Sequence, residues 1–321
     1  MTRPIFIISL PRSGSTLLQR LLMSDGRAAT LGEPSLLLRF LGEGDLAARR
    51  SVYGEFLVDI AVDDMRKHWP GYDDSYRDGV RRLILDLYTG LADGKEWFID
   101  KTPRYTLIAD EILKTFPDAK FIVLWRHPLA VVASMANMTG KDFWFPEEHS
   151  IDLYQGLLKL AEFTEQHKES CCVTRYEDLV AKPMEELARI GDYLGWEGLE
   201  QTLDKQLPSS AGGTLGDPTG THKFSQVSTD SLEGWHDAYH NLYRTHWARN
   251  YVRDKRADIM KSMGYELPDG IAKSSKLGLP SLLRDWAKAW VRRRRRITKP
   301  KWVERSRKHY RETHEVDVMW K

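Results

Sequence analysis

Cysteine is scarce in this chain of 321 residues, which contains only Cys171 and Cys172, side by side in an apolar segment that leads into Val173. The segment favours a strand, and neighbouring residues of a strand point to opposite faces of the sheet, so a disulfide between the two cysteines is disfavoured. We therefore expect two buried thiols and a reducing compartment.

Long apolar runs are also missing. No segment approaches the roughly 18 apolar residues that a membrane-spanning helix needs. The apolar residues 5–10 lead directly into a polar loop, unlike a secretory signal. Apolar residues make up 41% of the chain and charged residues 29%, as in globular proteins. The length favours a single large α/β domain, with two small domains as the alternative, and we expect a cytoplasmic protein.

Acidic residues are nearly absent from the C-terminal part. Residues 292–311 contain eleven Lys or Arg and one acid, Glu304, so their net charge is +10. Because the whole chain carries +2, the rest of it carries −8. We therefore divide the chain into a domain over residues 1–270 and a basic, tryptophan-containing extension over residues 271–321.

The extension combines apolar and basic residues. Leu283, Trp286 and Trp290 alternate with charged residues just before five consecutive arginines, residues 292–296. Leucine, tryptophan and clustered arginine suit an anionic membrane surface, so one expectation is that residues 282–311 bind the inner face of a membrane. A solvated charged tail is the alternative, and no nucleic-acid partner is expected.

The most informative stretch lies near the N-terminus. Residues 5–8, Ile-Phe-Ile-Ile, predict a buried strand of a parallel sheet, and leucines at helical spacing from residue 17 predict a helix. Between them, residues 11–16 read Pro-Arg-Ser-Gly-Ser-Thr. A strand, a tight loop and a helix suit phosphate binding, because backbone N–H groups and the positive end of the helix dipole converge on one point. Gly14 permits close approach of an anion, and Arg12 adds a fixed charge.

This loop lacks the lysine of loops that bind ATP or GTP. Those loops have the pattern G-x-x-x-x-G-K-[ST], in which the lysine contacts the β- and γ-phosphates and the hydroxyl binds Mg²⁺. Here the loop is shorter, and Arg12 precedes the glycine. A Ser/Gly turn that only caps a helix is the alternative, but it leaves Arg12 at the strand end unexplained.

Two charged residues follow further predicted strands. Glu33 comes after a short strand expected around Leu31 and just before Pro34, where it could instead cap a helix. Lys101 follows the apolar residues 97–99, with an ordinary surface lysine in a turn as the alternative. Ligands of open parallel sheets bind at the carboxyl ends of the strands, so we expect both residues on the same edge as the loop.

A second strand–turn–helix unit follows. Residues 121–125 predict a buried strand that ends at Arg126, and Pro128 suits the first turn of a helix. Ser134 lies eight residues after Arg126, or about two helical turns. We expect His127, between the strand and the helix, to face outward.

Three later features complete the pattern. The strand that includes the cysteines leads into Tyr-Glu-Asp-Leu, which begins at Tyr176. Residues 207–235 are rich in Pro, Ser, Gly and Thr and predict a loop, in which Lys223 is a basic candidate. One helix is expected over residues 238–263.

In chain order, four sequences resemble motifs of sulfotransferases that use 3′-phosphoadenosine-5′-phosphosulfate (PAPS). They are Pro-Arg-Ser-Gly-Ser-Thr, Lys-Thr-Pro, Arg-His-Pro with a later serine, and Tyr-Glu-Asp-Leu. The likeness is to the bacterial and tyrosylprotein-sulfotransferase-like branch. It implies an α/β fold with a P-loop-type parallel sheet flanked by helices, in a single sulfotransferase domain. It also implies PAPS as co-substrate, 3′-phosphoadenosine-5′-phosphate (PAP) as product, and no required metal.

The resemblance implies two phosphate-binding groups. The 5′-phosphosulfate would be held by the N-terminal loop, through Arg12, Ser13, Gly14, Ser15 and Thr16. The 3′-phosphate would be held by Arg126 and Ser134. Tyr176 would pack near the adenosine, with a core position as the alternative, and Lys223 would belong to a loop that closes over the cofactor.

The resemblance also implies catalytic roles. Glu33 would accept the proton of a hydroxyl or amine acceptor that attacks sulfur in line with the leaving group. Lys101 and Arg12 would stabilise the bridging and sulfuryl oxygens. The sequence does not identify the acceptor.

Two other functions stay open. A nucleotide kinase-like P-loop enzyme with an altered loop would bind ATP and depend on Mg²⁺. A non-catalytic PAPS-binding or membrane scaffold protein would bind the cofactor without turnover, although the intact set of Arg12, Glu33, Lys101, Arg126 and Ser134 argues against it.

Overall fold

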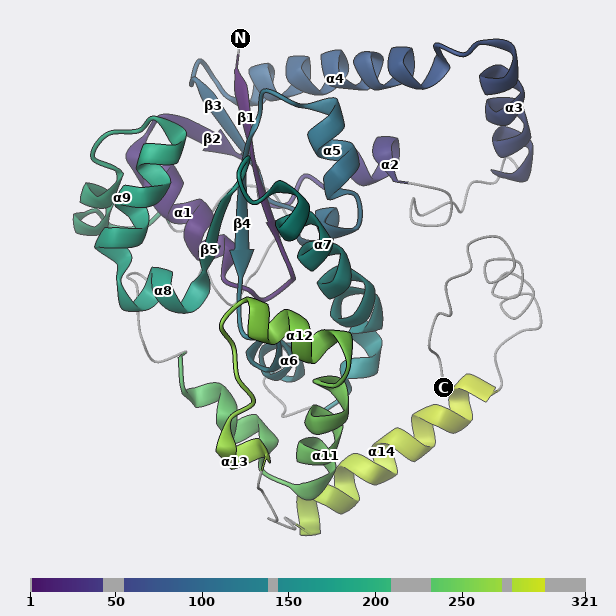
Figure 1. Ribbon diagram of the computed structural model, residues 1–321, viewed down its shortest axis with the longest axis vertical. Helices are drawn as coiled ribbons and strands as arrows, with labels where there is room; N and C mark the ends of the chain where they lie inside the picture. Colours follow the sequence, from purple (N-terminus) through teal and green to yellow (C-terminus); the bar gives the residue numbers. More distant parts are fainter. Residues whose placement is uncertain (1, 43–54, 138–143, 209–231, 273–278, 298–321) are drawn as a thin grey trace.

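The protein is built around one five-stranded parallel sheet (Figure 1). The computed structural model describes residues 2–42, 55–137, 144–208, 232–272 and 279–297. The strand order is β2-β3-β1-β4-β5, and all four neighbouring pairs are parallel. The strands are β1 (Arg3–Ser9), β2 (Ala28–Thr30), β3 (Trp97–Asp100), β4 (Lys120–Trp125) and β5 (Cys172–Arg175).

This strand order places a topological switch between β1 and β4. After β1 the chain moves toward the β2 edge of the sheet, whereas after β4 it moves toward the β5 edge. The loops that leave these two strands therefore diverge and open a crevice at their carboxyl ends, where open α/β sheets bind ligands. The predicted phosphate loop follows β1, and Arg126 follows β4.

The alternation of apolar side chains along β1 supplies both faces of the sheet. Ile5 and Ile7 pack on one face with α1 (Ser15–Asp25), α8 (Tyr176–Ala181) and α9 (Pro183–Leu194). Phe6 and Ile8 pack on the other face with α4 (Tyr72–Leu91), α5 (Ala109–Thr115) and α7 (Leu157–His167). Figure 1 shows the two helical layers on either side of the sheet. The predicted fold class is thus confirmed.

The remaining elements connect or extend these layers. They are α2 (Leu37–Leu41), α3 (Glu55–His68), η2 (Pro103–Leu107), α6 (Pro128–Ala136), η3 (Pro146–His149), η4 (Ile151–Gly156), η5 (Leu199–Asp204), η7 (Gly234–Tyr239), α11 (Leu242–Tyr251), α12 (Lys255–Ser262), α13 (Asp269–Ala272) and α14 (Leu279–Ile297). Among the residues that the structure describes, no helix is long and apolar enough to cross a membrane.

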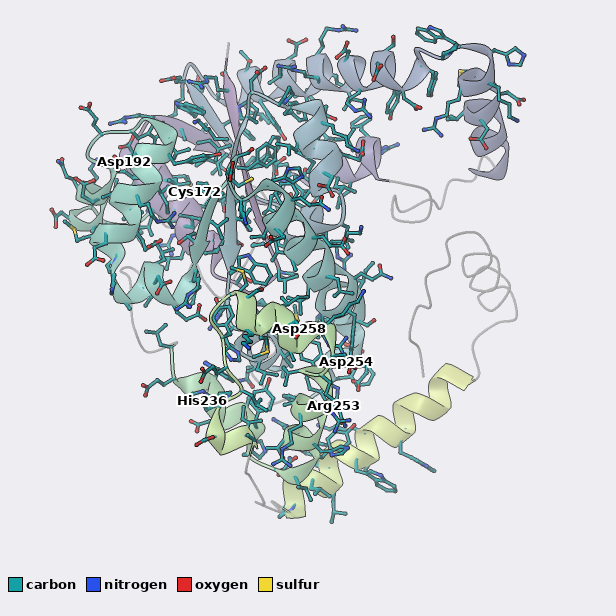
Figure 2. The ribbon with its side chains drawn as sticks, viewed as in Figure 1. Cys172, Asp192, His236, Arg253, Asp254 and Asp258 are labelled. Atoms are coloured by element: carbon teal, nitrogen blue, oxygen red, sulfur yellow. The ribbon has the colours of Figure 1, made fainter. Side chains whose placement is uncertain are left out.

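The two cysteines are buried and form no disulfide, as predicted. Cys172 begins β5, and its position in the interior is visible in Figure 2. Burial raises the pKa of Cys171 to about 12, because the thiolate would have to leave water. Cys171 therefore acts as a small apolar group, whereas Cys172 Sγ accepts a hydrogen bond from Arg189 Nη1 over 3.4 Å.

Two predicted elements differ in the structure. The strand expected around Leu31 ends at Thr30, and Leu31 is exposed. The single helix expected over residues 238–263 is divided into η7, α11 and α12. Asn241 starts α11 by accepting a hydrogen bond from the backbone N–H of Arg244, and Asp254, with φ of 54°, breaks the chain direction before α12 (Figure 2). Apolar periodicity alone does not reveal these caps.

Candidate active site

The phosphate loop lies between β1 and α1 and has an unusual backbone. Arg12 and Gly14 both have positive φ angles, 67° and 89°. Gly14 also lies against the ring of Tyr176: a Cβ at this position would be 2.2 Å from Tyr176 Cδ2. Only glycine satisfies both the left-handed backbone and this close packing. The loop is therefore fixed by contact with the element that follows β5.

The two predicted phosphate-binding motifs contact each other. Arg12 Nε donates a hydrogen bond to Ser134 Oγ on α6 over 3.1 Å, and Arg126 Nη1 donates to the carbonyl oxygen of Arg12 over 2.8 Å. Arg126 Cζ also lies 4.5 Å from the centre of the Tyr176 ring. Burial lowers the pKa of Arg126, but a guanidinium stays charged in proteins. Four candidate residues from four segments therefore form one cationic cluster.

A second cluster joins the ends of β2 and β3. Lys101 Nζ donates a hydrogen bond to Glu33 Oε1 over 2.7 Å and a longer one to Thr16 Oγ1 over 3.4 Å. The side chain of Lys101 is 1% exposed, whereas that of Glu33 is 26% exposed. Thr16 is in the first turn of α1, so the ion pair lies beside the phosphate loop. The Glu33 carboxylate is therefore accessible to a ligand, while the buried Lys101 fixes its position through the hydrogen bond.

The segment that carries Glu33 is fixed from two sides. Gln19 of α1 donates hydrogen bonds to Thr30 Oγ1 over 2.7 Å and to the carbonyl oxygen of Gly32 over 3.0 Å. On the other side, the backbone N–H of Ser35 donates to Thr102 Oγ1 over 3.0 Å. Sequence reasoning missed Gln19, whose signal is a polar residue on the buried face of an apolar helix.

A buried carboxylate, Asp100, lies behind the ion pair. It is fully buried and accepts hydrogen bonds from the hydroxyls of Tyr88, Tyr105 and Thr102. Tyr105 Oη in turn accepts from the backbone N–H of Leu37 over 3.2 Å. Desolvation raises the pKa of Asp100 to about 6, although the three donors and Lys101 oppose the shift. Sequence reasoning missed this residue too, and its signal is an acid at the end of the apolar strand β3.

The prediction that His127 faces outward is wrong. The residue is buried and caps α6, where Nδ1 accepts a hydrogen bond from the N–H of Leu129 over 3.2 Å. Nε2 lies 3.0 Å from the carbonyl oxygen of Glu266, so the neutral ring carries its proton on that nitrogen. Burial lowers the pKa of His127, which favours this neutral form. The rings of Trp235 and Tyr265 cover the imidazole, with ring centres 4.6 and 5.3 Å from its own.

The structure thus brings most predicted site residues to one edge of the sheet. Ser13, Gly14, Ser15 and Thr16 form the loop and the first turn of α1, between the two clusters. Lys223 lies outside the described residues, so its role stays a prediction. Within the parts of the chain that the structure describes, no group of three or more His, Cys, Asp or Glu side chains is placed to hold a metal ion.

Comparison with known proteins gives a consistent result. The sequence model described as "Sulfotransferase family" matches residues 4–201. Nodulation protein NoeE of Sinorhizobium fredii is 29% identical over 293 residues, which cover 81% of this chain and 65% of NoeE. The chain therefore spans just under two thirds of that relative's length. A putative protein-tyrosine sulfotransferase of Caenorhabditis briggsae is 23% identical, with 73% of this chain and 81% of the relative covered.

Solved structures share the fold. The sulfotransferase domain from the curacin biosynthetic pathway aligns with a TM-score of 0.56 and 22% identity, covering 84% of this chain and 99% of that domain. The sulfotransferase domain of the Synechococcus PCC 7002 olefin synthase aligns with a TM-score of 0.53 and 22% identity, covering 83% and 96%. At this level of identity the likeness concerns the fold.

Proposed function

This chain belongs to the sulfotransferase family, and from that premise we propose that it transfers the sulfuryl group of PAPS to a hydroxyl or amine of an acceptor. The protein is a transferase, in a family for which PAPS dependence is typical. The observation that carries the proposal is the Lys101–Glu33 pair at 2.7 Å beside Thr16 of the phosphate loop. The pair places a cation, which can stabilise the leaving group, next to a carboxylate, which can take the proton of the acceptor.

The donors at this edge of the sheet fit a nucleotide with two phosphate groups. Arg12, Arg126 and Ser134 supply two guanidinium groups and a hydroxyl, which suit a 3′-phosphate. The loop residues 13–16 supply backbone N–H groups, three hydroxyls and the N-terminus of α1, which suit a 5′-phosphosulfate. Tyr176 is 8% exposed, and its ring packs against Gly14 and under Arg126, so it supports the loop and Arg126 from within the core; its place near the adenosine stays a prediction.

The transfer follows from these roles. The acceptor oxygen or nitrogen attacks sulfur and forms the new bond, while the bond between sulfur and the bridging oxygen breaks and leaves its electron pair on PAP. Glu33 takes the acceptor proton, and Lys101 stabilises the negative charge on the departing oxygen. The sulfuryl group carries less charge than a phosphoryl group, so we expect no metal requirement.

Arg12 takes a more specific role than the resemblance alone implies. Its Nε bonds Ser134, on the side of the cationic cluster that contains Arg126. We therefore assign Arg12 first to binding of the cofactor phosphates and second to stabilising the sulfuryl oxygens. Lys101 is the principal group for the bridging oxygen.

The acceptor class is open to direct test. The name of the Caenorhabditis briggsae relative, a putative protein-tyrosine sulfotransferase, points to the phenolic hydroxyl of peptide tyrosine as one acceptor to assay. A cytoplasmic location also belongs to the proposal. Membrane-associated acceptors are the other class, and they concern the C-terminal helix described below.

Calorimetry and radiolabel transfer test the proposal together. We expect PAP to bind far more tightly than AMP, because AMP lacks the 3′-phosphate. Radiolabelled PAPS should lose its sulfuryl label to a peptide, lipid or small-molecule pool only when the enzyme is present, and chelator should not stop it. Equal affinity for PAP and AMP, or tight binding of Mg-ATP, would overturn the sulfotransferase assignment.

A further inference from the structure

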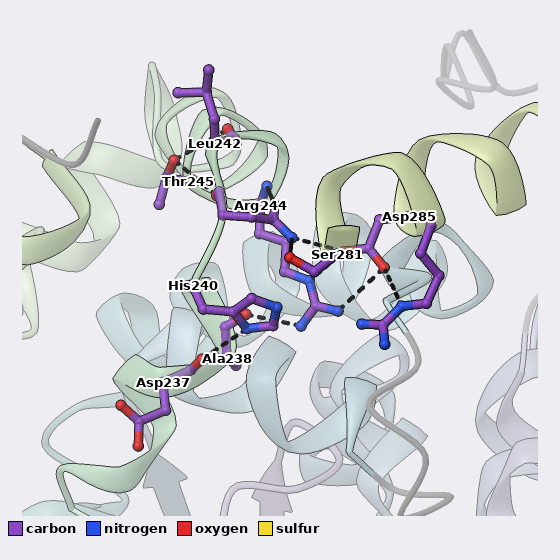
Figure 3. Close-up of polar contacts among 10 residues, drawn as sticks. Asp237, Ala238, His240, Leu242, Arg244, Thr245, Ser281 and Asp285 are labelled. Atoms are coloured by element: carbon purple, nitrogen blue, oxygen red, sulfur yellow. Dashed lines mark hydrogen bonds and ion pairs between the residues drawn. The ribbon is translucent and has the colours of Figure 1, made fainter. Parts of the chain in front are cut away.

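The C-terminal helix α14 is attached to the body by its polar side. Arg244 of α11 donates to both carboxylate oxygens of Asp285, through Nε over 2.7 Å and Nη2 over 3.3 Å (Figure 3). Asn241 Nδ2 adds hydrogen bonds to Asp285 over 3.0 Å and to Ser281 over 3.1 Å. The side chains of Arg244 and Asp285 are 0% exposed. This contact is a dry, bidentate ion pair with additional hydrogen bonds.

Arg244 has further partners besides Asp285. Its Nη1 donates to the carbonyl oxygen of Ala238 over 2.9 Å, and Cζ lies 4.9 Å from the Trp144 ring. Its own N–H is bonded to Asn241 Oδ1 over 3.0 Å. A buried ion pair holds only when its remaining donors are satisfied, so the orientation of α14 about its own axis is well defined.

The apolar side of α14 consequently faces away from the body. Successive residues of a helix are about 100° apart, so Leu283 and Trp290 lie about 140–160° around the helix from Asp285, with Trp286 beside them. These three side chains are 59%, 47% and 57% exposed, in the same order. A surface helix of a globular protein ordinarily buries its apolar stripe and exposes its polar side. In α14 the polar side is buried against the body and the apolar stripe is exposed.

We propose that this stripe, Leu283, Trp286 and Trp290, binds an anionic lipid bilayer and holds the body of the protein at the membrane surface. Charge selects this occupant: five consecutive arginines, residues 292–296, continue the same helix directly after the stripe. Tryptophan prefers the boundary between headgroups and acyl chains, and arginine beside it reaches the lipid phosphates. Each arginine near an anionic leaflet strengthens binding about fivefold.

The ion pair adds a geometric element to this proposal. A flexible tail would tether the body at variable distances, whereas the Arg244–Asp285 contact fixes the body relative to the membrane-facing stripe. Resting on the proposed function, this arrangement favours a lipid or another membrane-borne molecule as the sulfuryl acceptor. The membrane contact itself does not depend on that function.

Vesicle co-sedimentation of the full-length protein tests the contact. We expect the protein to pellet with vesicles of phosphatidylglycerol and phosphatidylcholine, to stay in solution with phosphatidylcholine alone, and to be released as salt screens the arginines. Trp286→Ser combined with Trp290→Ser should weaken binding about tenfold or more. Met65→Ser combined with Trp69→Ser is the matched control, because it removes two exposed apolar side chains elsewhere and should leave binding unchanged.

Four measurements separate the alternatives. Hydrogen exchange should show α11 equally protected with and without anionic vesicles; faster exchange at residues 241–245 on vesicles would overturn the fixed attachment. Equal vesicle binding by the Trp286→Ser/Trp290→Ser variant and the parent would overturn the role of the stripe in membrane binding. A dimer in solution that the same variant dissociates would also overturn it, because the stripe would then bind a second copy of the chain. PAP affinity should be equal in parent and variant, so a failure of the sulfotransferase assignment would be recognised separately.

Discussion

Lys101 Nζ and Glu33 Oε1 lie 2.7 Å apart, although the two residues are 68 positions apart in the chain. The parallel sheet accounts for this proximity, because β2 and β3 are neighbours and both residues follow the carboxyl ends of those strands. The pairing also places the partly exposed Glu33 side chain beside a buried lysine, at the edge of the sheet that carries the phosphate loop. The contact therefore links fold topology directly to the proposed chemistry.

Replacing the carboxylate tests its role as base. Glu33→Gln keeps the size and one acceptor oxygen, so PAP affinity should stay near the parent value. The turnover number should fall about 10²–10⁴-fold, the range for loss of a general base. The measurement is kcat from radiolabelled PAPS, with PAP affinity from calorimetry on the same preparation.

Glu96→Gln is a suitable control for that substitution. Glu96 is exposed and its only described ion pair, with Arg3, spans 3.6 Å at the opposite end of the sheet from the site. Its kcat should equal that of the parent. A Glu33→Gln enzyme with normal kcat would show that another group takes the acceptor proton.

Arg126 should account for recognition of the 3′-phosphate. A charged hydrogen bond contributes about 1.5–3 kcal/mol, so Arg126→Ala should remove roughly that amount of the preference for PAP over AMP. Calorimetry with both nucleotides measures the preference directly. Arg66→Ala, which removes an exposed arginine of α3, should leave it intact. An unchanged PAP preference in Arg126→Ala would place the 3′-phosphate elsewhere.

Gly14 offers a test of the loop backbone. Gly14→Ala adds a Cβ 2.2 Å from the Tyr176 ring at a φ of 89°, so the loop must shift and PAP affinity should fall by about tenfold or more. Gly90→Ala is the contrasting variant. Gly90 lies within α4, and a Cβ there meets no atom within 4 Å, so alanine should stabilise the fold by up to about 1 kcal/mol and leave PAP affinity unchanged. Calorimetry and urea unfolding measure the two effects, and equal PAP affinity in both variants would refute the packing argument.

Much of the sheet could be predicted because its signals are local. Residues 5–8, 97–99 and 121–125 are apolar runs that end at polar or charged residues, and each one is a strand in the structure. The same reasoning placed Arg12, Lys101 and Arg126 at strand ends. It did not reveal that Arg12 bonds Ser134, because side-chain pairing between motifs 122 positions apart has no local signature.

The residues that sequence reasoning missed are mostly polar groups inside the core. Asp100 and Gln19 have partners within about 13 positions in the chain, but these contacts depend on how the strands and helices pack, and neither residue has a motif. His127 was misjudged because Glu266, which contacts its ring, lies 139 positions later. The covering rings of Trp235 and Tyr265 belong to the same late part of the chain. The orientation of α14 depends in the same way on Arg244, so an amphipathic pattern alone did not show which side faces the body.

Asp100 leads to a prediction about stability and pH. Burial raises its folded-state pKa from the ordinary value of 3.8 to about 6, so the folded protein binds this proton more tightly than the unfolded chain. The corresponding stability is fully present below about pH 4 and is lost as the pH rises toward 6. Within that window the loss is about 1.4 kcal/mol per pH unit.

Asp100→Asn removes this titration while keeping the hydrogen bonds. The amide oxygen can accept from Tyr88 and Tyr105, and the amide nitrogen can donate to Thr102, so the variant should fold. Urea unfolding between pH 4 and pH 7 should show the variant gaining stability relative to the parent as the pH rises to about 6, and no further change above it. Asp86→Asn, at an exposed position of α4, should follow the parent throughout. A constant difference between Asp100→Asn and the parent across this range would mean that Asp100 is already ionised at low pH, held as a carboxylate by its tyrosines and by Lys101.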